Sequence, residues 1–84
     1  MKTMWIDQAV EATVEFPSSL TFPRLRAIRF RDEEIAFPTP ARVDPTPSAL
    51  VYRMRAGARE YTLRFEPTHQ RWTLESIRAS SVLP

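Results

Sequence analysis

The sequence is poor in the residues on which most catalytic and metal sites depend: its 84 residues include no cysteine, one histidine and one glycine. The lack of cysteine excludes disulfides, thiol nucleophiles and cysteine-based zinc sites. The single glycine nearly excludes the glycine-rich loops that hold phosphates, and no P-loop, dinucleotide fingerprint or nucleophile elbow is present. We therefore expect a protein that is not an enzyme and that holds no cofactor or metal ion.

Long apolar runs are also missing. The apolar start at residues 4–6 stops at Asp7, so a secretory signal is not expected. No stretch approaches the length of a membrane span, so no membrane contact is expected. A cytoplasmic location fits this pattern, and the lack of cysteine is compatible with a reducing compartment.

The residues that are present are sufficient for one small core. Hydrophobic residues make up 43% of the chain and aromatic residues 11%, which favours a folded chain over a disordered one. The length fits a single domain over residues 1–84. The eight prolines are expected to separate the structural elements, because proline breaks helix interiors and central strands. Residues 38–48 are predicted as an ordered, extended proline-rich loop, and residues 79–84 as a frayed tail.

Between the prolines the apolar pattern has a period of two, which is typical of strands. Residues 9–16 carry apolar side chains at positions 10, 12, 14 and 16, with polar side chains between them. This alternation predicts a half-buried strand. A helix over residues 3–14, with Ile6, Val10 and Val14 on one face, remains the alternative.

A hairpin is predicted from residues 25–31 and 34–37. Phe30 is expected opposite Ile35, and Ile28 opposite Phe37, which places all four apolar side chains on one face. The connection at residues 31–34 contains no glycine. We therefore expect a longer type I turn in place of a primed two-residue turn.

The clearest pattern lies in the last third, where strands are predicted at residues 50–55, 60–66 and 71–77. Gly57 and Ala58 fit a two-residue type II′ turn, with glycine first. The resulting pairs are Arg55 with Glu60, Met54 with Tyr61, Tyr52 with Leu63 and Leu50 with Phe65. This register places the apolar side chains of both strands on one face, and a one-residue slip would separate them.

Together these segments predict an all-β fold. It is a single small antiparallel sheet, curled into a barrel-like meander of five or six strands, because so few residues must bury one face of it. Trp5 and Phe22 lie outside the clear strands and are expected to cover an end of the barrel.

Arginine is the one abundant charged residue, with eleven arginines against one lysine. Four arginines lie within eight residues without an acid between them, and three more lie on the outer face of the last strands. Because arginine binds phosphate in bidentate fashion, these residues are the candidate nucleic-acid contacts. The alternative is a solvated face of mixed charge. The candidates are Arg24, Arg26, Arg29, Arg31, Arg53, Arg55 and Arg64.

An enzyme would have to use the acidic turn at residues 32–34 or the single histidine, His69. Paired carboxylates can hold a divalent cation or transfer protons. No second carboxylate cluster or histidine is positioned by the sequence to complete such a site. A solvated hairpin turn is the favoured interpretation of the three acids.

Residues 5–12 read WIDQAVEA, and residues 51–53, 60–63 and 71–74 read VYR, EYTL and RWTL. The first stretch resembles the opening pattern of the DUF6504 family of small bacterial domains, and the others resemble its closing strands. Residues 28–31 stand where that family has a Trp-Arg-Gly-Arg hairpin, and the glycine is absent here. The resemblance implies an all-β bacterial domain with no established catalytic residues. Family members are often encoded near error-prone DNA polymerase components, which implies a link to DNA repair.

From these patterns we expect a non-enzymatic β interaction module, a bacterial accessory protein that binds another protein. The expectation rests on the lack of a catalytic constellation and on the rigid proline-rich segment. The alternative is an arginine-rich, nucleic-acid-binding small barrel linked to DNA repair, and an enzyme ranks below both. The chain is expected to be a monomer or a homodimer paired through sheet edges.

Overall fold

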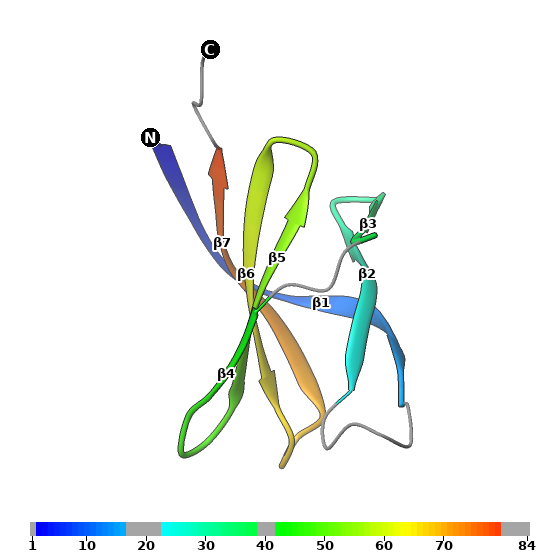
Figure 1. Ribbon diagram of the computed structural model, residues 1–84, viewed down its shortest axis with the longest axis vertical. Helices are drawn as coiled ribbons and strands as arrows, with labels where there is room; N and C mark the ends of the chain where they lie inside the picture. Colours follow the sequence, from blue (N-terminus) through cyan, green and yellow to red (C-terminus); the bar gives the residue numbers. More distant parts are fainter. Residues whose placement is uncertain (1, 17–22, 39–41, 80–84) are drawn as a thin grey trace.

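The computed structural model describes residues 2–16, 23–38 and 42–79, and every regular element within them is a strand. The strands form one antiparallel sheet in the order β3-β2-β1-β7-β6-β5-β4 (Figure 1). No helix in these three ranges is suited to cross a membrane. The all-β prediction is confirmed, with seven strands in place of five or six. The strands are β1 (Lys2–Glu15), β2 (Arg24–Phe30), β3 (Glu33–Ala36), β4 (Arg42–Pro45), β5 (Leu50–Ala56), β6 (Arg59–Glu66) and β7 (Arg71–Ala79).

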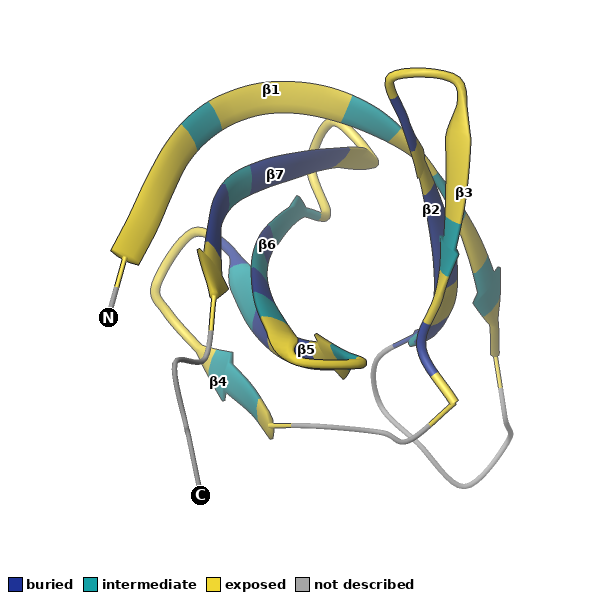
Figure 2. Cartoon of the chain, turned by 90° about the horizontal axis from the view of Figure 1, so that it is seen from above, coloured by how far each residue is buried: buried dark blue, intermediate teal, exposed yellow. Residues whose placement is uncertain are grey.

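The sheet curls into a half-barrel whose inner face is the core (Figure 2). The curling follows from the period-two pattern, because each strand directs its apolar side chains to one face and this face must be covered. The described residues form no second layer over this face, so the sheet covers itself. The core residues are Leu25, Ile28, Phe30, Phe37, Tyr52, Met54, Tyr61, Leu63, Trp72, Leu74 and Ile77.

The strand β1 joins the two halves of the sheet. Its first part pairs with β7 and its last part, residues 11–15, pairs with β2. The pairing with β7 shifts between Trp5 and Gln8, where Asp7 has a φ of 50°. Such an irregularity bends a strand and changes the direction of its side chains. The helical alternative for residues 3–14 is therefore wrong, and the strand prediction for residues 9–16 is confirmed through Glu15. Phe16 comes directly after the strand and is exposed, so it does not share the buried face.

The hairpin of β5 and β6 has the predicted register. Arg55 lies opposite Glu60, and Tyr52 lies opposite Leu63. Gly57 has a φ of 63°, and no other atom outside its neighbours lies within 4 Å of where a Cβ would stand. The positive φ alone therefore explains why the single glycine of the chain is at this position.

The hairpin of β2 and β3 differs from the prediction. Phe30 lies opposite Glu33 and Ile28 opposite Ile35, so the connection is the two residues Arg31 and Asp32. Their φ angles of 54° and 61° are those of a type I′ turn. This turn matches the twist of the strands well enough to form without glycine. Compared with the predicted register, β3 is shifted by two residues along β2. An even shift leaves the same side chains on the inner face.

The proline-rich segment also differs from the prediction. Arg42–Pro45 forms β4, whereas a loop was expected throughout residues 38–48. An edge strand tolerates Pro45, because a proline there removes no hydrogen bond from the middle of a sheet. Residues 39–41 lie outside the described residues. So do residues 80–84, which make up all but the first residue of the expected frayed tail; Ala79 is the last residue of β7.

The two halves of the sheet meet through side chains. The hydroxyl of Tyr52 on β5 donates a buried hydrogen bond to the carbonyl oxygen of Pro23, just before β2, at 2.5 Å. Phe37, just after β3, meets Tyr61 on β6 edge to face, with ring centroids 5.5 Å apart. Trp72 packs on the rings of both Tyr52 and Phe65. These aromatic contacts close the core although β3 and β4 do not pair with each other.

Alkaline pH is expected to destabilise the fold through Tyr52. Burial raises the pKa of Tyr52 from 10.0 to about 12. Between these two pKa values the folded chain keeps a proton that the unfolded chain loses. The contribution of Tyr52 to the free energy of unfolding is therefore fully present below pH 10, and it falls by about 1.4 kcal/mol per pH unit as the pH rises from the lower pKa to the higher one. Urea unfolding from pH 8 to pH 11.5 measures this slope. The Tyr52→Phe variant should lose about 1–3 kcal/mol at pH 8 and show a flatter alkaline limb. Equal slopes for both proteins above pH 10 would contradict the prediction.

Asp32→Gly is expected to raise the free energy of unfolding by about 0.5–1 kcal/mol. Asp32 has a φ of 61°, and glycine adopts positive φ without the steric cost that an L side chain carries. Glu34→Gly is the matched control, because Glu34 is exposed but lies within β3. It should lower stability instead, since glycine weakens a strand interior. Urea midpoints compare the two variants, and destabilisation by both would refute the assigned turn.

Candidate functional site

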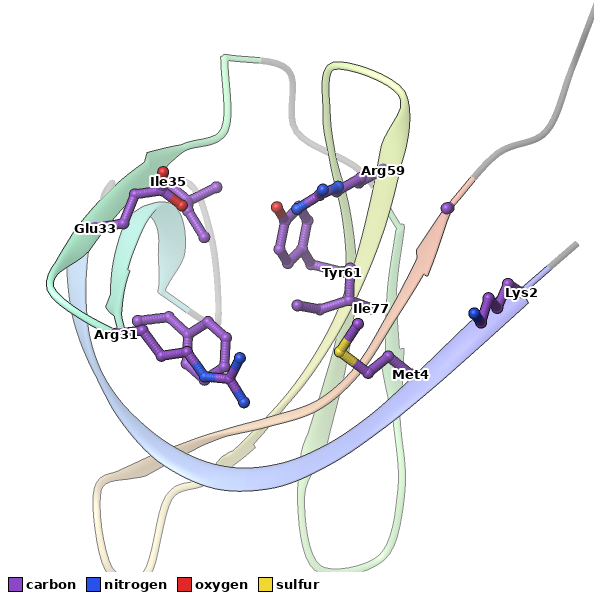
Figure 3. A pocket seen from close by; sticks show the side chains of 10 residues that line it. Lys2, Met4, Arg31, Glu33, Ile35, Arg59, Tyr61 and Ile77 are labelled. Carbon is purple, nitrogen blue, oxygen red and sulfur yellow. The ribbon is translucent and has the colours of Figure 1, made fainter.

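One end of the half-barrel is hollow, and we call this hollow the mouth. The β2–β3 turn, the β5–β6 turn, the start of β1 and the end of β7 gather there, at the upper end of the view in Figure 1. A cavity of about 240 Å³ lies between the β2–β3 hairpin on one side and β6, β7 and β1 on the other (Figure 3). Its lining is apolar inside and charged at the rim.

The apolar part of the mouth is an extension of the core. Phe30, Tyr61 and Ile77 are buried core residues that also line the cavity. Ile35 is half-buried, and Met4 is 52% exposed. Met4 lies opposite Ile77 in the β1–β7 ladder, so both side chains are on the inner face. The cavity is therefore an uncovered part of the inner face, because no strand closes the gap between β3 and β4 within the described residues.

The rim carries three cations and one acid: Lys2, Arg31, Arg59 and Glu33. The guanidinium of Arg31 lies over the ring of Phe30, 4.8 Å from its centroid. This contact holds the charge at the cavity by a cation–π interaction. None of the three cations forms an ion pair with another described residue. Three cations against one acid leave an excess of positive charge among the described residues at the edge of the cavity.

The arginines of β2 lie on the outer face, and their neighbours are acids. Arg26 pairs with Glu15 of β1 at 3.6 Å. Arg29 lies opposite Glu11 of β1 and Glu34 of β3. Arg24, in turn, lies opposite Glu15. The run that contains no acid along the sequence is thus flanked by acids in the sheet.

The outer arginines of β5 and β6 are also beside acids. Arg53 lies 3.9 Å from Asp44 of β4. Arg64 bonds Glu75 of β7 and lies 4.0 Å from Glu66. Arg55 lies opposite Glu60. The outer face of the sheet is therefore of mixed charge both at β2 and at β5 and β6.

The structure does not bring the seven candidate arginines into one surface. Arg24, Arg26 and Arg29 are on β2, while Arg53, Arg55 and Arg64 are on β5 and β6. Three strands, β1, β7 and β6, separate β2 from β5 in the sheet. Among the seven, Arg31 alone lines the mouth. Nucleic-acid binding by these residues stays a prediction.

The acidic turn and the histidine are not brought together either. Asp32 and Glu33 belong to the turn at the mouth, while His69 lies in the β6–β7 turn at the opposite end of the sheet (Figure 1). The amide of His69 donates to the carbonyl of Glu66 at 3.2 Å, which is a β-turn with Pro67 at its second position. Within residues 2–16, 23–38 and 42–79, no three histidine, aspartate or glutamate side chains are arranged to hold a metal ion.

Lys2 and Arg59 were missed as site residues from the sequence, and Glu33 was considered there only as part of the acidic turn. A signal for them was present, because each continues the apolar phase of its strand: Lys2 with Met4, Arg59 with Tyr61, and Glu33 with Ile35. A charged residue at the end of an inward-facing series marks the rim of a barrel. Trp5 was expected to cover a barrel end, but it is 79% exposed and lies opposite Ser76 on the outer face. Phe22, the other expected cover, lies outside the described residues.

Comparison of the chain with protein-family models, with curated proteins and with solved structures finds no match. The resemblance to the DUF6504 family therefore stays an expectation. The mouth and the sheet edge of β3 beside it are the features from which a function is inferred.

The two tryptophans are expected to differ in accessibility to solvent quenchers. Trp5 is 79% exposed, whereas Trp72 is 8% exposed and stacked on Phe65. Acrylamide should strongly quench the tryptophan fluorescence of the native protein. Trp5→Phe should remove most of the quenchable fluorescence and leave the blue-shifted emission of Trp72. A Trp5→Phe variant as quenchable as the native protein would show that β1 does not direct Trp5 outward.

Proposed function

We propose that the protein is a non-enzymatic interaction module that binds an extended segment of another protein along the free edge of β3. The observation that carries the proposal is the position of this edge beside the mouth. Glu33 and Ile35 of β3 both line the cavity. An added strand would continue the wall of the half-barrel and direct alternate side chains toward the cavity.

The free edge of β3 offers two backbone amides. The amide of Phe37 donates to the carbonyl of Arg26 on β2, at 2.8 Å. Alternate residues of an antiparallel strand bond the same neighbour, so Ile35 and Glu33 also face β2. Glu34 and Ala36 then direct their N–H and C=O groups away from β2. Among the described residues, β3 has no neighbour on that side.

The other edge of the sheet is less suited to pairing. The amide of Thr46 donates to the carbonyl of Ala49 at 2.8 Å, so Asp44 and Arg42 face β5. Val43 and Pro45 therefore face outward, and proline has no N–H to donate. This edge offers one amide where β3 offers two, and no part of the mouth cavity adjoins it. The sequence-based expectation of a protein partner rested on the proline-rich segment. In the structure, this segment instead supplies the edge that is protected from pairing with another strand.

A protein partner is favoured over a nucleic acid by the distribution of charge. The outer arginines lie beside acids on neighbouring strands, which opposes a continuous contact with a phosphate backbone. A different partner is also favoured over a second copy of the chain. Pairing two β3 edges would gather four glutamates, Glu33 and Glu34 from each copy, and like charges across strands destabilise pairing.

Ala36→Pro is expected to weaken partner binding about tenfold, because it removes one of the two outward amides and leaves the ladder with β2 intact. The probes are random dodecapeptides, displayed in one library with free C-termini and in another followed by a linker. Peptides selected from the pooled libraries are synthesised and titrated by fluorescence anisotropy. Amide shifts at Glu34 and Ala36 in a heteronuclear NMR spectrum locate the contact.

Val43→Pro is the matched control, because it removes the one outward amide of the opposite edge. It should leave peptide affinity unchanged, and circular dichroism should show both variants folded. Failure to select any peptide from either library would refute the proposed function. Equal binding by Ala36→Pro and the native protein would refute the assignment to the β3 edge.

A further inference from the structure

We propose that the mouth recognises the C-terminal residue of the partner, holding its large apolar side chain in the cavity and its free carboxylate at the cationic rim. This inference rests on the proposed function, since it specifies which part of the extended segment lies at the mouth. Three properties of the mouth support it: its size, its charge and its place relative to the direction of β3.

The size of the cavity suits one side chain. Its volume is about 240 Å³. Small-molecule and cofactor sites typically enclose about 300–1,000 Å³, so this cavity is smaller than a typical site of that kind. One large aliphatic or aromatic side chain fits, and it would meet apolar atoms of Ile35, Tyr61 and Ile77. The mouth therefore fits a single anchoring residue of a longer chain.

The charge of the rim suits one carboxylate. Lys2, Arg31 and Arg59 face a single acid, Glu33. Guanidinium groups form charge-assisted, bidentate hydrogen bonds with carboxylates. Figure 3 shows that Arg31 comes from the hairpin side of the cavity and Arg59 from the facing side, so an anion at the opening has cations on both sides.

The direction of β3 brings a C-terminus to this place. β3 begins at the turn beside the mouth, with Glu33, and runs away from it to Ala36. An antiparallel segment on its free edge runs the opposite way, so it ends at the mouth. All pairs of the sheet are antiparallel. The last side chain of such a segment on the inner face lies beside Ile35 or Glu33, at the cavity.

An internal acidic segment fits less well. The chain of such a segment would continue past Glu33, which lines the cavity. An acidic side chain of the segment opposite this glutamate would be destabilising. The chain end supplies its negative charge on the backbone of the anchoring residue and needs no second acidic side chain. The observations therefore favour a terminal carboxylate over acidic side chains within a chain.

The experiment compares peptides that differ only at their last residue. The best binder of the free C-terminus library is synthesised with a C-terminal carboxylate or a C-terminal amide, and with its last residue unchanged or replaced by alanine. We expect the amide and the alanine peptide each to bind about tenfold more weakly, a difference of about 1.4 kcal/mol. The affinity of the carboxylate peptide should also fall with rising salt concentration.

Arg59→Gln and Arg55→Gln form a matched pair, because both flank the Gly57 turn but lie on opposite faces. Arg59 lines the mouth, while Arg55 lies opposite Glu60 on the outer face. Arg59→Gln should weaken the carboxylate peptide about tenfold and leave the amide peptide unchanged, which is the coupling expected of a direct contact. Arg55→Gln should affect neither peptide.

The inference is overturned if binders come from the linker-followed library alone, or if the amide and carboxylate peptides bind equally. In that event, continued loss of binding on Ala36→Pro leaves the proposed function standing. Conversely, amide-sensitive binding that Ala36→Pro does not change supports the mouth and refutes the edge. If Arg59→Gln and Arg55→Gln weaken the carboxylate peptide equally, the effect comes from net charge, and the proposed contact of Arg59 with the carboxylate is overturned.

Discussion

The shape of this protein depends on the contact between the two halves of its sheet, which the hydrogen bond from Tyr52 to the carbonyl of Pro23 helps to form. It joins β5 to the start of β2, which the sheet order separates by three strands. With the contact of Phe37 on Tyr61, it curls the sheet over its own apolar face. The closure is made by side chains and not by a backbone ladder between β3 and β4. Among the described residues, the half-barrel therefore has a covered core, two edges that pair with no further strand and an open end.

The open end matters because of how charge is distributed around it. On the outer face, arginines of one strand lie beside acids of the next, as for Arg26 with Glu15 and Arg64 with Glu75. The pair of Arg26 with Glu15 is exposed and adds little stability, whereas Arg64 and Glu75 are partly buried; both pairs reduce the net field of the surface. At the mouth, Arg31 and Arg59 form no ion pair with an acid among the described residues, although Glu33 lines the same cavity. The cationic rim of the mouth is thus better suited to an anion than the arginine-rich strands on the outer face.

Most of the fold was predictable because period-two patterns and turn chemistry are local properties. The β5–β6 register was predicted correctly, since one glycine and two apolar series agreed on it. The β2–β3 turn was not predicted correctly, because Arg31 and Asp32 adopt positive φ although neither is a glycine. The strand at Arg42–Pro45 was missed for a related reason. Proline argues against a central strand, but a sequence does not show which strand lies at the edge.

The candidate site was predictable only in part. The sequence by itself determined which side chains share a face, because alternation along each strand follows from backbone geometry. It also determined that Gly57 forms a turn and that one apolar face needs cover. Only the tertiary structure decided that Lys2, Arg31 and Arg59 meet at one cavity, because they come from distant parts of the chain. It likewise decided that the acid-free arginine run would be flanked by Glu11, Glu15 and Glu34. Strand order and curvature are set by long-range pairing, which no local pattern contains.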